Sequence, residues 1–223
     1  MKSRKPTVRS QKTEVHPPAS GLRPLLIVIS APSGGGKTTL CQQLLAARPD
    51  MTRAVTCTTR PPRPGEKDGV DYHFLDAAEF QRRVQAGDFL EHAMVFGRSY
   101  GTLKSEVLGR LRAGRDVLLN VDVQGAATIR KRAQTEPELR RALVTVFLAP
   151  ASVTMLAERL KKRGADTPGE IQKRLGVARK EIAQWQNFDY LLISSTIQGD
   201  LGRMLAIVEV EKLRTARTAA PGF

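Results

Sequence analysis

Four short stretches of the chain are almost continuously apolar and rich in branched side chains. They cover Leu25–Ser30, Asp116–Val121, Leu143–Leu148 and Tyr190–Ile193. Because such runs are typical of strands that are covered on both faces, each is predicted to be a buried strand. Helical periodicity lies between them, near residues 36–47, 124–133, 151–163, 168–186 and 200–214. This alternation predicts an α/β fold with a parallel sheet and helices on both of its faces.

The region between residues 51 and 102 breaks the alternation. Two expected strands, Met51–Thr56 and Asp88–Phe96, mix polar with apolar residues, and turn residues are frequent around them. One amphipathic helix is predicted at Ala77–Gln85. The pattern therefore predicts an inserted α+β subdomain over residues 51–102.

The two ends of the chain lack any periodic pattern. Residues 1–23 are polar, basic and interrupted by prolines, which predicts a disordered arm. Such an arm is either a solvated tail or a segment that binds a partner, and the sequence favours the tail. A short flexible tail is expected over residues 216–223.

Composition excludes some classes of protein and leaves others open. Apolar residues make up 41% of the chain, which is enough for a core and argues against global disorder. The net charge of +14 suits either nucleic acid or phosphate-rich small molecules, so charge alone does not decide the partner. Cys41 and Cys57 have no metal-ligand or disulfide spacing. With no apolar run long enough for a membrane span and no secretory signal, a cytoplasmic protein is expected.

A glycine-rich segment, APSGGGKTTL, follows the first predicted strand directly. It matches the phosphate-binding pattern G-x-x-x-x-G-K-[ST], except that an alanine replaces the first glycine. Glycines let successive backbone N–H groups converge on phosphate oxygens, the lysine adds a mobile cation, and the threonine hydroxyl is a ligand for Mg²⁺. The segment predicts a nucleoside triphosphate site made by Ala31, Pro32, Ser33, Gly34, Gly35, Gly36, Lys37, Thr38 and Thr39.

A second unusual segment, TTRPPRPGEKDGVDYHF, lies inside the predicted insertion. Its prolines stiffen the backbone, so Arg60 and Arg63 are held at low entropic cost. Two guanidinium groups suit a dianionic phosphate, and the hydroxyls of Tyr72 and Tyr100 are additional donors. This segment therefore predicts a site for a second phosphate.

A helical flap is predicted near residues 160–175. Arg159 and Arg163 share one helix face, and Gly164 is a plausible stop for that helix. Thr167-Pro168-Gly169-Glu170 has the form of a capping box, so a new helix is expected to begin there and to carry Arg174. Arginines on both sides of a short hinge are suited to closing over phosphates.

Several of these segments together resemble one enzyme family. APSGGGKTT, TTRPPRPGEKDGVDYHF, FLEHAMVFGRSYGT, DVQGA, RLKKRG and EIQKR follow one another between about residues 25 and 210. In this order they are similar to the guanylate kinases, P-loop nucleoside monophosphate kinases that phosphorylate GMP with ATP. The resemblance implies a five-stranded parallel core (residues 24–50 and 103–215), a GMP-binding subdomain (51–102) and a lid (about 160–175).

The same resemblance implies roles for individual residues. The GMP phosphate would be bound by Arg60, Arg63, Tyr72 and Tyr100, and guanine by Glu91, Thr56, Thr102 and Asp122. Catalysis would rest on Lys37, Arg159, Arg163 and Arg174. Mg²⁺ would arrive with ATP and be held by Thr38, with Asp122 acting through water. An ionised carboxylate accepts both N1–H and the 2-amino group of guanine, whereas adenine would leave Glu91 unpaired.

Three positions depart from the usual pattern of this family. Thr56 replaces a serine but keeps the hydroxyl, so contact with guanine is expected to remain. Asn120 replaces an acid near the expected magnesium site, and Ser194 replaces an asparagine near the expected adenine site. The first change could lower turnover, and the second puts the adenine contact in doubt.

Two other classes of function fit the sequence less well than a kinase. A kinase-like module that has lost catalysis would show a damaged phosphate loop or missing lid arginines, and both are present. A nucleic-acid-binding NTPase would need stacking side chains, yet aromatic residues are only 5% of the chain. Weak contact of the basic arm with nucleic acid stays open. A monomer or a small homo-oligomer is expected.

Overall fold

A parallel sheet of five strands forms the centre of the computed structural model, which describes residues 22–95, 97–162 and 167–218. The strand order is β2-β7-β1-β8-β9, and every neighbouring pair is parallel. The five strands are β2 (Met51–Arg53), β7 (Asp116–Asn120), β1 (Leu26–Ser30), β8 (Leu143–Ala149) and β9 (Tyr190–Ile193). The four strands predicted from apolar runs are confirmed.

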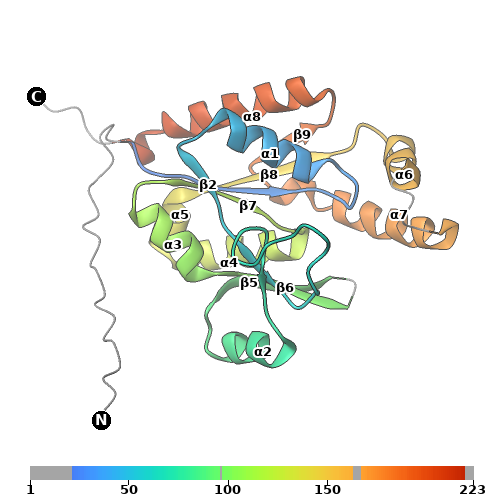
Figure 1. Cartoon of the computed structure of the whole chain (residues 1–223). Coiled ribbons are helices and arrows are strands. Elements are labelled where there is room, and N and C mark those ends of the chain that lie inside the picture. Colours follow the sequence, from blue (N-terminus) through green and yellow to red (C-terminus); the bar gives the residue numbers. More distant parts are fainter. Residues whose placement is uncertain (1–21, 96, 163–166, 219–223) are drawn as a thin grey trace, which may run out of the picture.

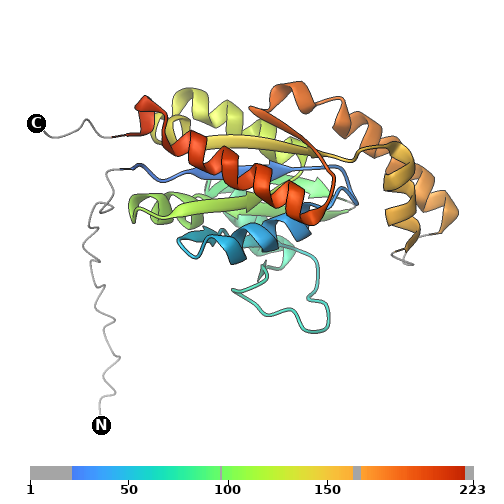
Figure 2. The same cartoon turned by 90° about the horizontal axis from the view of Figure 1, so that it is seen from above.

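Helices cover both faces of this sheet (Figures 1 and 2). One face is covered by α1 (Lys37–Ala47) and α8 (Ile197–Lys212), and the other by α3 (Lys104–Arg112), α4 (Val123–Thr135) and α5 (Pro137–Ala142). Because side chains alternate along a strand, Ile27 of β1 packs into the first core and Val28 into the second. The predicted fold class is confirmed.

A second, four-stranded sheet lies beside the first, with the order β4-β3-β6-β5. It consists of β4 (His73–Phe74), β3 (Thr56–Thr58), β6 (Arg98–Leu103) and β5 (Phe89–Val95), and α2 (Ala77–Gln85) packs on it. Phe80 of α2 stacks on Phe89 with ring centroids 4.6 Å apart, and Cys57 completes this small core.

The strand predicted over residues 51–56 is two strands. Met51–Arg53 pairs with β7 in the large sheet, and Thr56–Thr58 pairs with β6 in the second sheet. Ala54 still donates its N–H to Leu118 O, at 3.0 Å, but the N–H of Val55 donates to Glu106 Oε2, at 3.1 Å. The carboxylate of Glu106 thus replaces a backbone acceptor at Val55 and ends the pairing of β2 with β7, and the chain then crosses to the second sheet. Residues 51–53 therefore lie in the core sheet, outside the insertion that was predicted to begin there.

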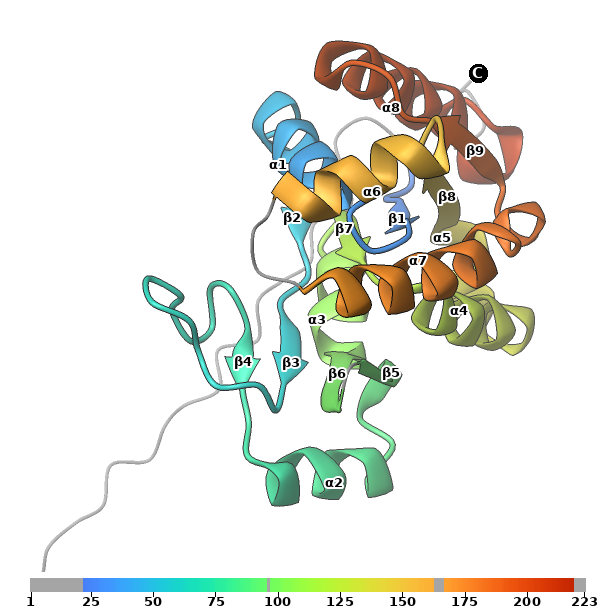
Figure 3. The ribbon, with the colours of Figure 1, turned by 90° about the vertical axis from the view of Figure 1, so that its right-hand side faces the viewer.

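Two helices project from the carboxyl end of the sheet (Figures 1 and 3). They are α6 (Val153–Lys162) and α7 (Pro168–Ile182), and they pack on each other through Leu156, Leu160, Ile171, Leu175 and Ala178. The predicted capping box is confirmed, since Thr167 and Glu170 bond each other's backbone N–H groups. We call α6 and α7 the lid helices. The second ends at Ile182, and a 3₁₀ turn, Trp185–Asn187, follows.

The two ends of the described chain meet at the opposite side of the molecule. Leu22 and Thr218 form a β-bridge, and a 3₁₀ turn precedes it at Thr215–Arg217. The Arg217 guanidinium is buried, donates to Arg141 O and Leu143 O, and pairs with Glu211. A flexible tail was predicted from residue 216, but Arg217 is anchored because its guanidinium bonds carbonyls at the end of α5 and at the start of β8. No helix within residues 22–95, 97–162 and 167–218 is long and apolar enough to cross a membrane.

Replacing Arg217 with alanine is expected to lower the free energy of unfolding by about 2–4 kcal/mol, because the buried Glu211 would lose its buried cationic partner. Arg214 pairs with the same carboxylate but has a side chain that is 62% exposed. Arg214→Ala is therefore the matched control, with an expected loss of about 0–1 kcal/mol. Urea unfolding of the two variants measures both values, and equal losses would contradict an anchoring role for Arg217.

Candidate active site

The glycine-rich segment forms a tight loop between the end of β1 and the start of α1. Gly34 and Gly36 have φ angles of +85° and +95°, a left-handed conformation that side chains disfavour. The N–H of Gly35 donates to Pro32 O at 2.9 Å, which closes the turn. A hollow of about 200 Å³ lies inside the loop and is lined by Pro32–Thr39. The hollow therefore lies at the amino end of α1, where the first N–H groups of a helix favour an anion.

Lys37 extends from the first turn of α1 toward the end of the neighbouring strand β7. Its Nζ donates to Ala31 O at 3.1 Å and to Val121 O at 3.3 Å. Burial lowers the pKa of the Lys37 ammonium, and the nearby carboxylates of Glu181 and Asp122 oppose this change. The cation is therefore held between the loop and the carboxyl end of β7, where α/β proteins bind ligands.

Both lid helices contact the phosphate loop (Figure 3). Arg159 of α6 donates to Gly35 O at 3.4 Å, and Arg174 of α7 donates to Ser33 Oγ at 3.3 Å. A Cβ atom on Gly34 would lie 3.0 Å from Leu156, so the glycine also permits the close approach of α6. Two of the predicted lid arginines are thus brought to the loop. The third, Arg163, lies outside the described residues.

The phosphate loop and the second sheet line one pocket of about 370 Å³. Ser33 and Lys37 line it from the loop. The other lining residues are Arg53, Ala54, Thr56, Tyr72, Glu91, Ala93, Val95, Tyr100, Asn120, Val121 and Asp122. The space therefore connects the predicted triphosphate site with the residues predicted to hold a nucleoside monophosphate.

A buried carboxylate forms the floor of this pocket. Glu91 is only 3% exposed and accepts a hydrogen bond from Thr102 Oγ1 at 2.7 Å. Thr102 is the strand partner of both Glu91 and Thr56, so the three predicted guanine contacts lie on adjacent strands. Burial raises the pKa of Glu91 to about 7, with Asp122 adding to the rise and Thr102 opposing it. The second oxygen of Glu91 faces Gly125, where an added Cβ would lie 2.7 Å away.

The stiff segment carries its two arginines differently. Arg60 is only partly exposed, lies 5.3 Å from the ring centre of Tyr72 and is paired with Glu66. Tyr72 and Tyr100 have ring centroids 6.2 Å apart, so both hydroxyl-bearing rings line the same corner of the pocket. Arg63 is exposed and does not line the pocket. Of the four predicted phosphate contacts, three gather together.

A further pocket of about 350 Å³ lies on the other side of the phosphate loop. It is lined by Gly34, Gly36, Thr39, Leu40, Arg159, Ser194, Ser195, Ile197 and Asp200. Asp200 accepts from Ser194 Oγ at 3.0 Å and from the N–H of Ser195 at 2.8 Å. The pocket adjoins the phosphate loop at Gly34 and Gly36 and includes Ser194, at the position where the adenine contact was in doubt.

Comparison with known proteins decides the family. A model of the guanylate kinase family matches residues 23–210. The chain belongs to the guanylate kinase family. It is 43% identical over 189 residues to a guanylate kinase of Coxiella burnetii, covering 85% of this chain and 88% of that relative. It is 45% identical over 195 residues to one of Alcanivorax borkumensis, covering 87% and 91%. The crystal structure of guanylate kinase from Anaplasma phagocytophilum matches with a TM-score of 0.71 at 30% identity, covering 90% of this chain and 92% of that one.

Two acidic residues of this guanylate kinase family member were not among the predicted site residues. Glu66 bonds Arg60, and its place in the sequence, three residues after Arg63 in a turn, could have indicated it. Glu181 lies seven residues after Arg174 on α7, so both face the phosphate loop. Its Oε2 is buried and makes no hydrogen bond within the described chain. Burial raises the pKa of Glu181, and Lys37 and the N–H of Ser33 oppose the rise.

The oxygen ligands expected for magnesium are present near the loop. Mg²⁺ prefers a few carboxylate or hydroxyl oxygens together with substrate phosphates, which suits Thr38 and Asp122. Asp122 caps α4 by accepting from the N–H of Gly125 at 2.8 Å, which fixes its carboxylate beside Lys37 in the shared pocket. No group of three or more acidic, histidine or cysteine side chains in the described part of this family member could hold a metal by itself. The residues fit an ion that arrives with a nucleotide.

Proposed function

We propose that the protein transfers the γ-phosphoryl group of Mg²⁺-ATP to GMP, giving ADP and GDP. Family membership supports this reaction. The observation that carries it in this chain is the shared pocket, which has Ser33 and Lys37 on one side and Glu91 on the other. Two nucleotides bound there would meet at their phosphates.

In this proposal Glu91 selects guanine. Its ionised carboxylate accepts N1–H and the 2-amino group, and the hydroxyl of Thr102 donates to it and fixes its position. The hydroxyl of Thr56, on the strand that pairs with Thr102, is assigned to guanine. Asp122 lies beside the base at the amino end of α4. The phosphate of GMP is bound by Arg60, Tyr72 and Tyr100, while Arg63 is assigned a contact that requires its exposed side chain to turn inward.

The donor side neutralises and positions the transferred group. Backbone N–H groups within residues 33–39 bind the phosphates of ATP, and Lys37 bridges toward the γ-phosphate. Arg159, Arg163 and Arg174 add positive charge as the transition state forms. Mg²⁺, held by ATP, Thr38 and Asp122 through water, would supply charge neutralisation between the phosphates. An oxygen of the GMP phosphate is already an anion and attacks in line, so no general base is needed.

The test is an assay of ADP formation by the purified chain with Mg²⁺-ATP and, in turn, GMP, AMP, CMP and UMP. Turnover is expected with GMP alone and is expected to stop when EDTA removes the metal. Turnover with another monophosphate would refute the assignment of Glu91. If ADP formation is independent of any acceptor, the kinase proposal is wrong. The free thiols of Cys41 and Cys57 are buried, which suits the reducing cytoplasm that we propose as the site of action.

The affinity for GMP is expected to rise with pH. With its pKa raised to about 7, Glu91 is mostly protonated at pH 6 and cannot accept both guanine donors. The KM for GMP is expected to fall about tenfold between pH 6 and pH 8 and then to level off. Steady-state assays at saturating ATP measure this. The phosphate of GMP also titrates near pH 6, so calorimetry on Glu91→Gln, which keeps only that titration, is the control. A KM that is flat over this range contradicts the prediction.

A further inference from the structure

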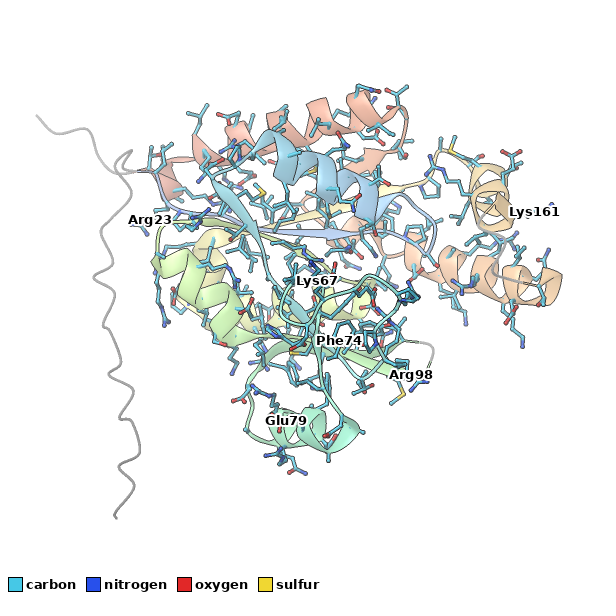
Figure 4. The ribbon with its side chains drawn as sticks, in the orientation of Figure 1. Arg23, Lys67, Phe74, Glu79, Arg98 and Lys161 are labelled. Atoms are coloured by element: carbon cyan, nitrogen blue, oxygen red, sulfur yellow. The ribbon has the colours of Figure 1, made fainter. Side chains whose placement is uncertain are left out.

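A pocket of about 170 Å³ lies at the edge of the large sheet that is opposite the phosphate loop. We call it the amino-edge pocket, and it is lined by Arg23, Pro24, Leu111, Glu138, Arg141 and Ala142. Two of these residues directly precede β1 and two directly precede β8, and these strands are parallel neighbours. Figure 4 shows Arg23 on the side of the molecule away from the lid residue Lys161. The pocket is therefore separate from both nucleotide sites of the proposed function.

The register of the sheet brings two arginines together at this pocket. Leu26 of β1 pairs with Leu143 of β8. Arg23 comes three residues before Leu26, and Arg141 two residues before Leu143, so the two arginines lie on adjacent segments. Both backbones are also tied to the buried Arg217. The N–H of Arg23 donates to Arg217 O at 2.9 Å, and Arg217 Nε donates to Arg141 O at 2.8 Å. The backbones that carry the two exposed side chains are thus fixed relative to each other.

The chain itself does not neutralise these two guanidinium groups. In the part of the chain that the structure describes, the side chains of Arg23 and Arg141 have neither an ion pair nor a hydrogen bond. Glu138 also lines the pocket, but both of its carboxylate oxygens accept from Arg112, at 3.0 and 2.8 Å. The pocket therefore contains two uncompensated positive charges beside a carboxylate that already has its partner. Such an arrangement attracts an anion.

The size and the lining of the pocket suit a phosphate group. Its volume of about 170 Å³ is close to the volume of about 200 Å³ of the hollow inside the phosphate loop. Leu111 and Ala142 are buried and make part of the lining apolar, which strengthens interactions between charges at that wall. A guanidinium group binds two phosphate oxygens at once, and two guanidinium groups match the charge of a phosphate dianion. A carboxylate ligand, with a single charge, would leave one arginine unpaired.

We propose that the amino-edge pocket is an anion site that binds one phosphate group between Arg23 and Arg141. The ligand chemistry is a phosphate group, either free or esterified in a small molecule, or a phosphate of a nucleic-acid backbone. None of the lining residues takes part in the proposed kinase reaction, so the site is additional to it. A bound phosphate would link the segment before β1 to the segment before β8, where the two ends of the described chain meet.

The test begins with inorganic phosphate, titrated into the full chain at low ionic strength while NMR follows the backbone amides. The amides of Leu111 and Ala142 are expected to shift in a saturable manner, and the amides of the phosphate loop report separately on the nucleotide site. Arg23→Ala and Arg141→Ala are each expected to weaken binding at the amino-edge pocket about tenfold, because each removes charge-assisted hydrogen bonds. Both variants keep their backbone contacts with Arg217, so thermal unfolding is expected to be unchanged.

Arg115→Ala is the matched control. Arg115 is an exposed arginine that precedes β7 at the same edge of the sheet, but its Nη2 donates to Pro49 O at 3.5 Å and it does not line the pocket. Its removal deletes the same charge and is expected to change the affinity for phosphate at the pocket less than about twofold. The steady-state constants for ATP and GMP are expected to be unchanged in all three variants.

Two further probes determine the class and the source of the ligand. Acetate is expected to bind at least about tenfold more weakly than phosphate, because it has one charge and fewer acceptor oxygens. A short oligothymidylate that binds more tightly than phosphate, and loses this affinity in Arg23→Ala, would assign the site to a nucleic-acid backbone. Binding of phosphate without binding of the oligothymidylate would assign it to a small phosphate compound.

Three results would overturn the proposal. The first is that no amide around the pocket shifts with either phosphate probe. The second is that Arg115→Ala weakens binding as much as Arg141→Ala, which would mean a general attraction to a basic surface. The third is that acetate binds as tightly as phosphate.

Discussion

Replacing Glu91 with glutamine is expected to lower kcat/KM for GMP about 10²- to 10⁴-fold. Glutamine can accept from only one of the two guanine donors, and its own N–H₂ group meets the other donor directly. Two charge-assisted hydrogen bonds are worth about 1.5–3 kcal/mol each, which sets this range. Steady-state assays with GMP as the varied substrate measure the loss, and a change below tenfold would refute guanine selection by Glu91.

The same substitution is expected to stabilise the fold at alkaline pH. The pKa of Glu91 is raised from 4.5 to about 7 on folding, so its neutral form favours folding below pH 4.5, and this contribution is lost as pH rises toward 7. At pH 8 the buried carboxylate therefore costs on the order of 3 kcal/mol, which a neutral amide avoids. Thermal unfolding should give a higher unfolding temperature for Glu91→Gln than for the wild type at pH 8, and no such difference at pH 5. A lower stability of the variant at pH 8 would mean that the hydrogen bond from Thr102 stabilises the carboxylate by more than burial destabilises it.

Replacing Lys37 with methionine is expected to lower kcat about 10³-fold or more. The ammonium is fixed between Ala31 O and Val121 O, beside the phosphate loop. Positively charged groups that stabilise the negative charge of the transferred phosphoryl group change kcat by about this factor. Single-turnover assays with saturating Mg²⁺-ATP and GMP measure the change.

Lys131 is an exposed lysine on α4, and Lys131→Met is the matched control that should keep full turnover. Lys37→Met should also unfold at the same temperature as the wild type or higher, because burial disfavours the charged lysine in the folded protein. If Lys37→Met keeps turnover within tenfold of the wild type, the lysine has no part in the transfer. A lower unfolding temperature would attribute the loss to the fold instead.

The large sheet was predictable because its strands are buried on both faces. Every residue of a run such as Leu25–Ser30 fits a strand that is covered on both faces. The phosphate loop that follows was predictable because all of its phosphate-binding residues are consecutive in the sequence. The second sheet was predicted less well. Its strand β6, Arg98–Leu103, contains a glycine, a serine and an arginine, and its place is fixed by pairing with β3 and β5 rather than by its own pattern.

Some residues of the candidate site were likewise predictable from the sequence, and others were not. Arg60, Glu91 and Lys37 were assigned by chemistry and by resemblance. In the structure Glu91 and Lys37 line the shared pocket, and Arg60 lies against Tyr72, which also lines it. Glu66 and Glu181 were missed because a glutamate has many ordinary surface positions. Only the contacts with Arg60 and with the phosphate loop distinguish these two. A pairing between two side chains of one irregular turn, such as Arg60 and Glu66, leaves no periodic pattern in a sequence.

The bridge between Leu22 and Thr218 makes the described polypeptide nearly a closed ring. A short peptide linker could join these two residues, and new ends could then be opened in the exposed turn at Gly69, as chain termini that lie together permit circular permutation. Such a rearranged chain would retain the parallel sheet and its phosphate loop without interruption. The new chain ends would lie inside the subdomain that contains the second sheet. Changes at these ends would then alter that subdomain and leave the phosphate loop unchanged.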